Sequence, residues 1–382
     1  PVRLTPFPAR STTAARSRYE PGGSVEIAAE EKTEIDIISG SIAVGGTAGI
    51  GGAVAVPIIT KNTEAFIGAG AHVDALANKA GIDVRTGAFS VTYGDYGETD
   101  DGQVSAVSIS DDDVGADSSD SGEPTPLVDQ QLTHQRNATA QTRSGFKGVA
   151  VTAINQDDVA AYGVGAGVSG TVAVQISADV HVMTANTFAY IDDNARINEA
   201  DNNEGADQSV LVAAGNDYAH LGVAGGAAIS GVAGVTPGVE VSVVGITTKG
   251  YIGESAVVEA TKDVEVRAQS VEDVLAIAIA IGASGVVGVG GAVAAFVLNN
   301  VTYAYIDDGA TVNAGGNLLI AAADTTDVDI VAVGAGIDVG AAGIGAGVGV
   351  TIITKDTQAW IGDASVDAKG NSTAMTVYDG TL

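Results

Sequence analysis

The residues of this sequence whose types and spacing could do chemistry are mostly acidic. Residues 94–129 contain 11 Asp and Glu residues and no Lys or Arg. Residues 201–207 place oxygen-bearing side chains at alternate positions around Gly205. Because Ca²⁺ binds clustered carboxylate and carbonyl oxygens, both segments are candidate calcium sites, with a solvated acidic loop as the alternative for the first. The candidate ligands are Asp111, Asp112, Asp113, Asp117, Asp201, Asn203 and Asp207.

Side chains that could support catalysis do not form a recognisable motif. The four histidines are scattered and lack the spacing of a helical zinc motif. The pairs Asp192-Asp193 and Asp307-Asp308 could suggest glycosidase chemistry, but they recur in the same sequence context, which is typical of a turn. The chain has no cysteine and therefore no thiolate site. We expect a protein that is not an enzyme and requires no cofactor, with Ca²⁺ as the one candidate ligand.

The elements that must position these residues are repeats. A phrase of the form Thr-x-Ala/Gly-aromatic-Ile-Gly/Asp occurs five times, and its aromatic residues are Phe66, Tyr190, Tyr251, Tyr305 and Trp360. They lie 124, 61, 54 and 55 positions apart, and the first spacing is close to two periods of about 60 residues each. Self-similarity at a fixed period is the signature of a repeat array. We predict that the five aromatic residues occupy equivalent places and stack along one side of the molecule.

The local pattern within each repeat indicates β-strands. Ile35 and Ile37 alternate with acidic residues, as in a half-buried strand, and β-branched residues are abundant. The 52 glycines fit tight corners, where a positive φ is often needed. These features predict an all-β fold, a parallel β-solenoid or β-helix, whose repeats of about 55–62 residues make roughly three rungs of about 20 residues each. A β-sandwich array is the alternative, but sandwich domains usually have about 100 residues.

Charge and hydropathy restrict the classes of molecule that this protein could bind. The 47 Asp and Glu residues and 17 Lys and Arg residues give a net charge of −30, which repels nucleic acid and anionic lipid. Residues 274–298 are uncharged over 25 positions, long enough for a membrane span. Their glycines and alternating Ala-Ile pattern favour strands instead, so we expect no membrane insertion and no nucleic-acid binding. Strands that are apolar on both faces need cover, from the chain itself or from a neighbouring chain.

Composition divides the chain into four segments. Residues 1–23 form a basic N-terminal arm that contains four of the 17 cations. This arm is interpreted either as a flexible leader or fragment end, or as an arm that docks on an acidic neighbour. Residues 24–93 and 148–382 are β-solenoid repeats. Residues 94–147 are an acidic insert in a degenerate repeat that has lost its aromatic phrase.

The last three repeats share one further pattern. Residues 305–317 read Tyr-Ile-Asp-Asp-Gly-Ala-Thr-Val-Asn-Ala-Gly-Gly-Asn and are followed by an apolar strand and a Gly/Ala/Val tract. This pattern resembles the repeats of very large bacterial exoproteins exported by two-partner secretion, the filamentous-haemagglutinin-like and leukotoxin-like proteins. The resemblance covers residues 24–93 and 148–382, and it implies a right-handed parallel β-helix at the bacterial cell surface or released from it. The family's amino-terminal secretion domain is not visible in this sequence.

Two classes of function follow. The first is a structural extracellular element that self-associates head to tail into a surface fibre or filament, or forms the stalk of a large adhesin. The array begins within a unit at Ser24 and ends just after a repeat, so neither end looks capped; cuts in one longer chain would explain this equally. The alternative is a host-surface or glycan-binding adhesin or toxin module. The register of the aromatic residues favours the structural role.

Overall fold

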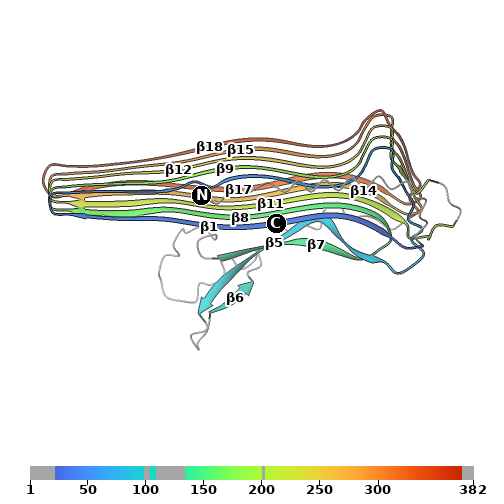
Figure 1. Cartoon of the computed structure of the whole chain (residues 1–382), viewed down its shortest axis with the longest axis horizontal. Coiled ribbons are helices and arrows are strands. Elements are labelled where there is room, and N and C mark those ends of the chain that lie inside the picture. The colour runs from blue at the N-terminus through green and yellow to red at the C-terminus, as the bar shows by residue number, and fades with distance from the viewer. Residues whose placement is uncertain (1–21, 99–103, 109–133, 200–202, 372–382) are drawn as a thin grey trace, which may run out of the picture.

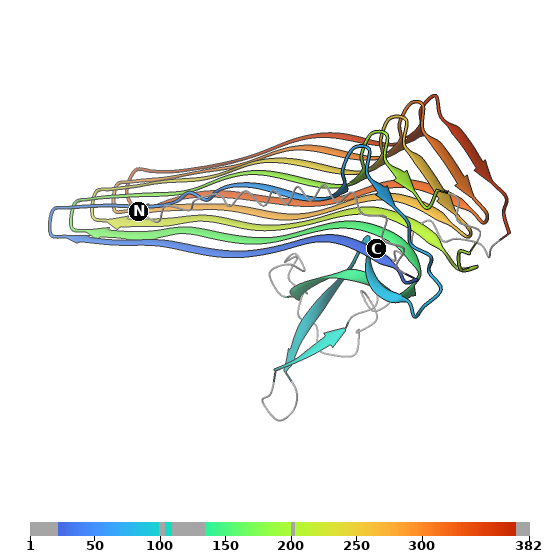
Figure 2. The same ribbon diagram turned by 45° about the vertical axis from the view of Figure 1, so that its right-hand side comes forward.

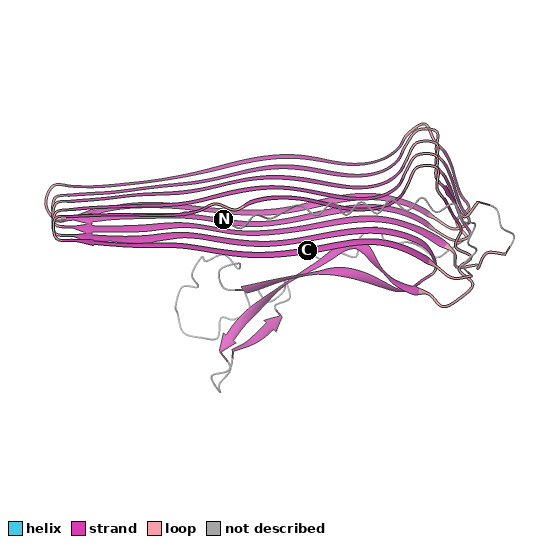
Figure 3. Cartoon of the chain, in the orientation of Figure 1, coloured by secondary structure: helices cyan, strands magenta, loops and turns pink. Residues whose placement is uncertain are grey.

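Every regular element of the described structure is a β-strand (Figure 3). The computed structural model describes residues 22–98, 104–108, 134–199 and 203–371. Within these ranges we find no helix with the length and hydropathy needed to cross a bilayer. The prediction of an all-β fold is confirmed.

The strands form three stacked parallel sheets and one small antiparallel sheet. Sheet A contains, in spatial order, β1 (Val25–Gly45), β8 (Gly148–Ser169), β11 (Ser209–Ser230), β14 (Val264–Ser284) and β17 (Leu318–Asp338). Sheet B contains β2 (Ala48–Ala55) with β3 (Ile58–Ile67), then β9 (Val172–Ile191), β12 (Ala233–Ile252), β15 (Val287–Ile306) and β18 (Ala342–Ile361). Sheet C contains β4 (His72–Val73), β10 (Arg196–Ile197), β13 (Val257–Ala260), β16 (Thr311–Ala314) and β19 (Ser365–Ala368). Sheet D contains β6 (Val104–Ser108), β5 (Ile82–Glu98) and β7 (His134–Phe146).

Successive units lie on top of one another, as Figures 1 and 2 show. Each unit passes through a long strand of sheet A, a tight turn, a long strand of sheet B and a short strand of sheet C. Pairing joins consecutive units, so that Val210 of β11 lies opposite Val264 of β14. These stacked parallel strands are the arrangement of a β-solenoid. The expectation of three rungs of about 20 residues per unit is wrong, because each unit makes one wide coil whose long strands extend about 70 Å without a corner.

The first two coils are in direct contact. Val25 of β1 pairs with Val149 of β8, which lies 124 positions later in the chain. The strands of sheet D lie between β1 and β8 in the sequence. Its strands β5 and β7 form an antiparallel pair beneath sheet A in Figure 1. The described strands at this step of the chain, β5, β6 and β7, therefore form a small sheet outside the stack.

The core of the stack differs between the two ends of each coil. At one end it is filled by apolar side chains, and at the other the two sheets lie close together. We call the end that contains sheet C the base, and the end with the turns between sheets A and B the tip, on the left in Figure 1. At the base, buried Val, Ile and Ala side chains from all three sheets form the largest core cluster, which includes Val212, Ile252 and Val258. Burial alternates along β9, β12 and β15 of sheet B, as the period of two predicts.

Glycine has a different role at the tip from the one expected. Only six glycines of the described residues have a positive φ, so tight corners account for few of them. Many others lie inside strands and face the opposite sheet. A Cβ atom added to Gly282 or Gly290 would lie well under 3.0 Å from backbone oxygens of neighbouring strands. These glycines let sheets A and B approach more closely than side chains would allow.

Sheet D covers the outer face of sheet A at the base. Phe89 of β5 packs with Ile154 and Val271 of sheet A. The guanidinium of Arg143 donates two hydrogen bonds, of 2.5 and 2.9 Å, to the carboxylate of Glu265. The chain itself therefore covers this part of sheet A, whereas the outward side chains of the doubly apolar tract, such as Ile279 and Val293, stay exposed. Residues 274–298 fall in β14 and β15, which confirms the prediction of strands.

The five aromatic residues of the repeated phrase form one continuous ladder. Neighbouring rings in the order Phe66, Tyr190, Tyr251, Tyr305 and Trp360 have centroids 5.1, 4.8, 4.9 and 4.3 Å apart. The angles between their planes are 6° or less. The prediction that these rings stack is confirmed. The rings lie on the outer face of sheet B, however, where Phe66 is exposed and the other four are half-buried, because the isoleucine that follows each ring takes the inward position.

Replacing the central ring tests how much the ladder stabilises the stack. Tyr251→Ala removes two ring contacts, each worth about 0.5–1.5 kcal/mol, so the free energy of unfolding should fall by about 1–3 kcal/mol. Tyr251→Phe keeps the ring and should change the free energy of unfolding little. Urea denaturation followed by circular dichroism measures both. Equal effects of the two substitutions would show that the hydroxyl, and not ring stacking, matters at this position.

Candidate functional site

A polar cluster lies between sheets A and B, toward the tip from the middle of the long strands. Sheet B contributes Asp179 and His181 from β9 and Glu240 and Ser242 from β12. Sheet A contributes His220 from β11. All five side chains are buried, with at most 2% of each residue exposed. The cluster is therefore an interior site, closed to solvent by the two sheets.

The stacking register brings these side chains together. Asp179 and Glu240 are direct partners on adjacent strands, as are His181 and Ser242. His220 lies across the interior from them, with its Nε2 3.9 Å from Glu240 Oε1. The rings of His181 and His220 have centroids 4.4 Å apart. One donor atom from each of Asp179, His220 and Glu240 lies within 4.8 Å of the other two, so these three residues could hold one metal ion.

Burial determines the electrostatics of the cluster. It raises the pKa of Asp179 to about 7, and the nearby carboxylate of Glu240 adds to the rise while the backbone N–H of Val180 opposes it. Burial also lowers the pKa of His181 to about 3, with His220 contributing in the same direction. Burial therefore favours the neutral forms of Asp179 and His181.

Sequence reasoning described the histidines as scattered and did not find this cluster. The fold brings His181 and His220 together because strands β9 and β11 face each other across the interior. A signal was present in the repeats. The partners of His220 on neighbouring strands are Val159 and Val274, and the other partner of Glu240 is Ala294. His220 and Glu240 are therefore ionisable residues at register positions where the neighbouring coils carry Val or Ala.

The predicted calcium ligands are only partly within the described residues. Asp111, Asp112, Asp113, Asp117 and Asp201 lie outside them. Asn203 is exposed, and its backbone oxygen accepts a hydrogen bond from Asn78. Asp207 is also exposed, with its carboxylate 3.4 Å from Lys147 Nζ and 3.6 Å from Lys262 Nζ. Its charge is therefore balanced within the chain, and calcium binding by the acidic insert stays a prediction.

The paired carboxylates are turn residues, as predicted. In the pair 307–308, Asp307 accepts a hydrogen bond from the backbone N–H of Asp308. The carboxylate of Asp308 accepts another, 2.7 Å long, from the backbone N–H of Asp363 in the next coil. Residues 192–193 make the equivalent bonds, with Glu254 as the donor from the next coil. These aspartates connect consecutive turns.

A second feature lies on the outer faces of the tip half, where exposed positions carry aliphatic side chains. On sheet A they are Ile38, Ile42, Val44, Val164, Val168, Ile229, Ile279, Val331, Val333 and Ile337. On sheet B, including the link between β2 and β3, they are Ile50, Val54, Val56, Ile58, Val172, Ile176, Val243, Val293, Ile344, Val348, Val350 and Ile352. We call these surfaces the apolar faces.

No protein-family model matches this chain, and neither does any curated protein or solved structure.

Proposed function

We propose that this protein is a structural β-solenoid that self-associates through its apolar faces and its end coils into an extracellular fibre or stalk. The proposal includes a right-handed coil, repeats of about 55–62 residues and a location at a bacterial surface, which the resemblance of the repeats supports. The observation that carries the proposal is the pair of apolar faces. They occupy opposite sides of the tip half and involve every coil.

The size of the apolar faces supports association. Five strands about 4.8 Å apart, with apolar positions along about 11 residues of sheet B, give an area of about 800 Å². The face on sheet A, with about seven such residues, covers about 550 Å². The largest apolar patch of a typical monomer is about 300–600 Å², whereas a stable interface buries about 800 Å² per partner. The face on sheet B reaches the size of an interface.

A second copy fits these faces better than a charged partner does. The net charge of −30 repels nucleic acid and anionic lipid. Acidic side chains lie instead on the base half of sheet A, for example Asp158 of β8. Two copies joined through their tip halves keep these charges apart. Flat sheets with aliphatic side chains can pack face to face about 10 Å apart.

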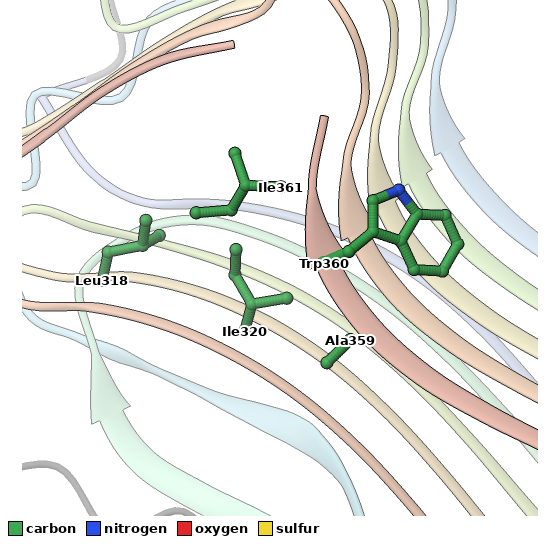
Figure 4. Close-up of a pocket in the computed structure, with 5 residues that line it drawn as sticks. All are labelled: Leu318, Ile320, Ala359, Trp360 and Ile361. Carbon is green, nitrogen blue, oxygen red and sulfur yellow. The ribbon is translucent and has the colours of Figure 1, made fainter. Parts of the chain in front are cut away.

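The last described coil provides the contact for end-to-end joining. Leu318, Ile320, Ala359, Trp360 and Ile361 line an open hollow of about 400 Å³. In Figure 4 the side chains of Ile320 and Ile361 extend into this hollow, while the ring of Trp360 points away from it. Ile361 is 46% exposed, although its partner Ile306 on β15 is buried. Another coil stacked here would bury these side chains and continue the aromatic ladder.

Charge introduced into the apolar face of sheet B should disrupt association. We expect the double variant Ile176→Lys/Val243→Lys to weaken self-association at least tenfold, because it places ammonium groups in an apolar contact. Thr184→Lys/Asn299→Lys adds the same charge at exposed outward positions of the polar half of sheet B, and should associate like the wild type. Sedimentation velocity at several protein concentrations measures the difference, and electron microscopy of the wild type shows whether filaments form.

Two results would contradict this proposal. One is a wild-type chain that stays monomeric at high concentration. The other is a monomeric wild type that binds lipid vesicles, with binding lost in Ile176→Lys/Val243→Lys, which would assign the apolar faces to a membrane surface.

A further inference from the structure

The buried cluster holds its histidine in the tautomer that a metal requires. His220 Nδ1 lies 3.0 Å from the backbone oxygen of Val159. A carbonyl oxygen can only accept a hydrogen bond, so Nδ1 carries a proton, and in the neutral ring Nε2 keeps its lone pair. Metal-binding histidines usually have such a carbonyl or carboxylate partner on the other ring nitrogen. Nε2 therefore points its lone pair toward the carboxylates of the cluster.

The cluster has more hydrogen-bond acceptor atoms than donor protons to satisfy them. The hydroxyl of Ser242 lies 2.5 Å from Glu240 Oε1 and 3.0 Å from His220 Nε2. Its single proton can serve only one of them. Both carboxylate oxygens of Asp179 and Oε2 of Glu240 are buried and accept no well-formed hydrogen bond, although the backbone N–H of Val180 approaches the Asp179 carboxylate. Unsatisfied carboxylate oxygens are costly inside a protein unless a cation compensates them.

A glycine keeps open the space between these acceptors. A Cβ atom on Gly222 would lie 2.9 Å from Glu240 Oε1, 2.9 Å from His220 Nε2 and 3.0 Å from Asp179 Oδ2. The partners of Gly222 on the adjacent strands are Ala161 and Ala276. Of these three strands, only β11, where the three donor atoms converge, has glycine at this register position. The vacant volume lies between the three donor atoms. Modest side-chain rotation would bring each of them to the distance of about 2.0–2.2 Å that Zn²⁺ requires.

From this geometry we propose that Asp179, His220 and Glu240 bind one divalent first-row transition-metal ion between sheets A and B. One imidazole nitrogen and two carboxylates suit Zn²⁺ and its neighbours in that series, since purely oxygen-binding cations do not need the nitrogen. His181 lies beside the site, and neither of its ring nitrogens has a partner. The ion would bind β11 of one sheet to β9 and β12 of the other, where glycine leaves little side-chain packing. Its role is structural.

Zinc binding during refolding tests the proposal. Because the site is buried, the unfolded chain is refolded with ZnCl₂ or with EDTA, then desalted, and its metal content is measured by mass spectrometry. We expect one Zn²⁺ per chain for the wild type and a higher melting temperature than in EDTA. Glu240→Gln removes a ligand charge at constant volume, and Gly222→Ala fills the space for the ion. Both should lower zinc content at least tenfold.

A matched control separates this site from other buried carboxylates. Glu272→Gln changes a carboxylate that is also buried, on the inward side of β14, and lies outside the proposed ligand set. This variant should bind zinc like the wild type. In EDTA, Glu240→Gln should melt no lower than the wild type, because it relieves the excess of acceptors. The proposal is overturned if the wild type binds no zinc, if zinc leaves its melting temperature unchanged, or if Glu240→Gln and Glu272→Gln bind zinc equally.

Discussion

The substitution Gly290→Ala should lower the free energy of unfolding by about 3 kcal/mol or more, at the upper end of the range for overpacked interiors. The added Cβ would clash with the backbone oxygens of Ala280 and Ala335 in sheet A. Backbone atoms of paired strands cannot move aside as a flexible side chain does, so the two sheets must separate. Chemical denaturation followed by circular dichroism measures the loss.

The neighbouring glycine provides the control. Gly291 lies on the same strand but faces outward, and a Cβ there would meet nothing within 4 Å. Gly291→Ala should raise stability by about 0.5 kcal/mol, because alanine loses less backbone entropy on folding than glycine. If the two substitutions had equal effects, the close approach of the sheets at the tip would be refuted.

The substitution Arg136→Met should cost about 3–5 kcal/mol, the range for removing one partner of a buried ion pair. The guanidinium of Arg136 contacts Asp217 at 2.5 and 3.2 Å and Asp273 at 2.9 Å. Both aspartate side chains are only 3% exposed. Methionine preserves much of the side-chain volume, so the loss reports on two buried carboxylates left without their cation. Thermal and chemical unfolding both measure it.

Arg196→Met is the matched control for that substitution. Arg196 pairs with Glu199 at the surface, where both side chains are more than a third exposed, and an exposed ion pair contributes about 0–1 kcal/mol. Adding Asp217→Asn and Asp273→Asn to Arg136→Met should restore most of the lost stability. A loss that persists in the triple variant would mean that Arg136 acts through packing of sheet D.

The sequence was sufficient for the parts of the fold that repeat. The phrase around Tyr251 and Tyr305 predicted that these rings occupy equivalent positions, because parallel in-register strands place like residues above one another. The width of the coil was not predicted. A period of two identifies a strand but does not show where the chain turns a corner, so strands of 20–22 residues could not be told from three shorter rungs.

The buried cluster could not be predicted without knowing which strands face each other. Asp179 and Glu240 share a register position, which an alignment of repeats can show. His220 belongs to the opposite sheet, and only the turn at residues 231–232 brings its strand back across the interior. Gly222 resembled the other glycines of the Gly/Ala/Val tracts. Its distinct role depends on three atoms from distant positions in the chain.

The two long ladders between consecutive coils have a mechanical consequence. Strands β11 and β14 are joined by 21 paired residues, and β12 and β15 by 20. A tensile load along the stacking axis is therefore shared by both ladders in parallel, and separating two coils requires many hydrogen bonds to break together. Each coil adds only about 4.8 Å of length. The stack is therefore costly in residues per unit length, but long paired ladders resist the separation of its coils.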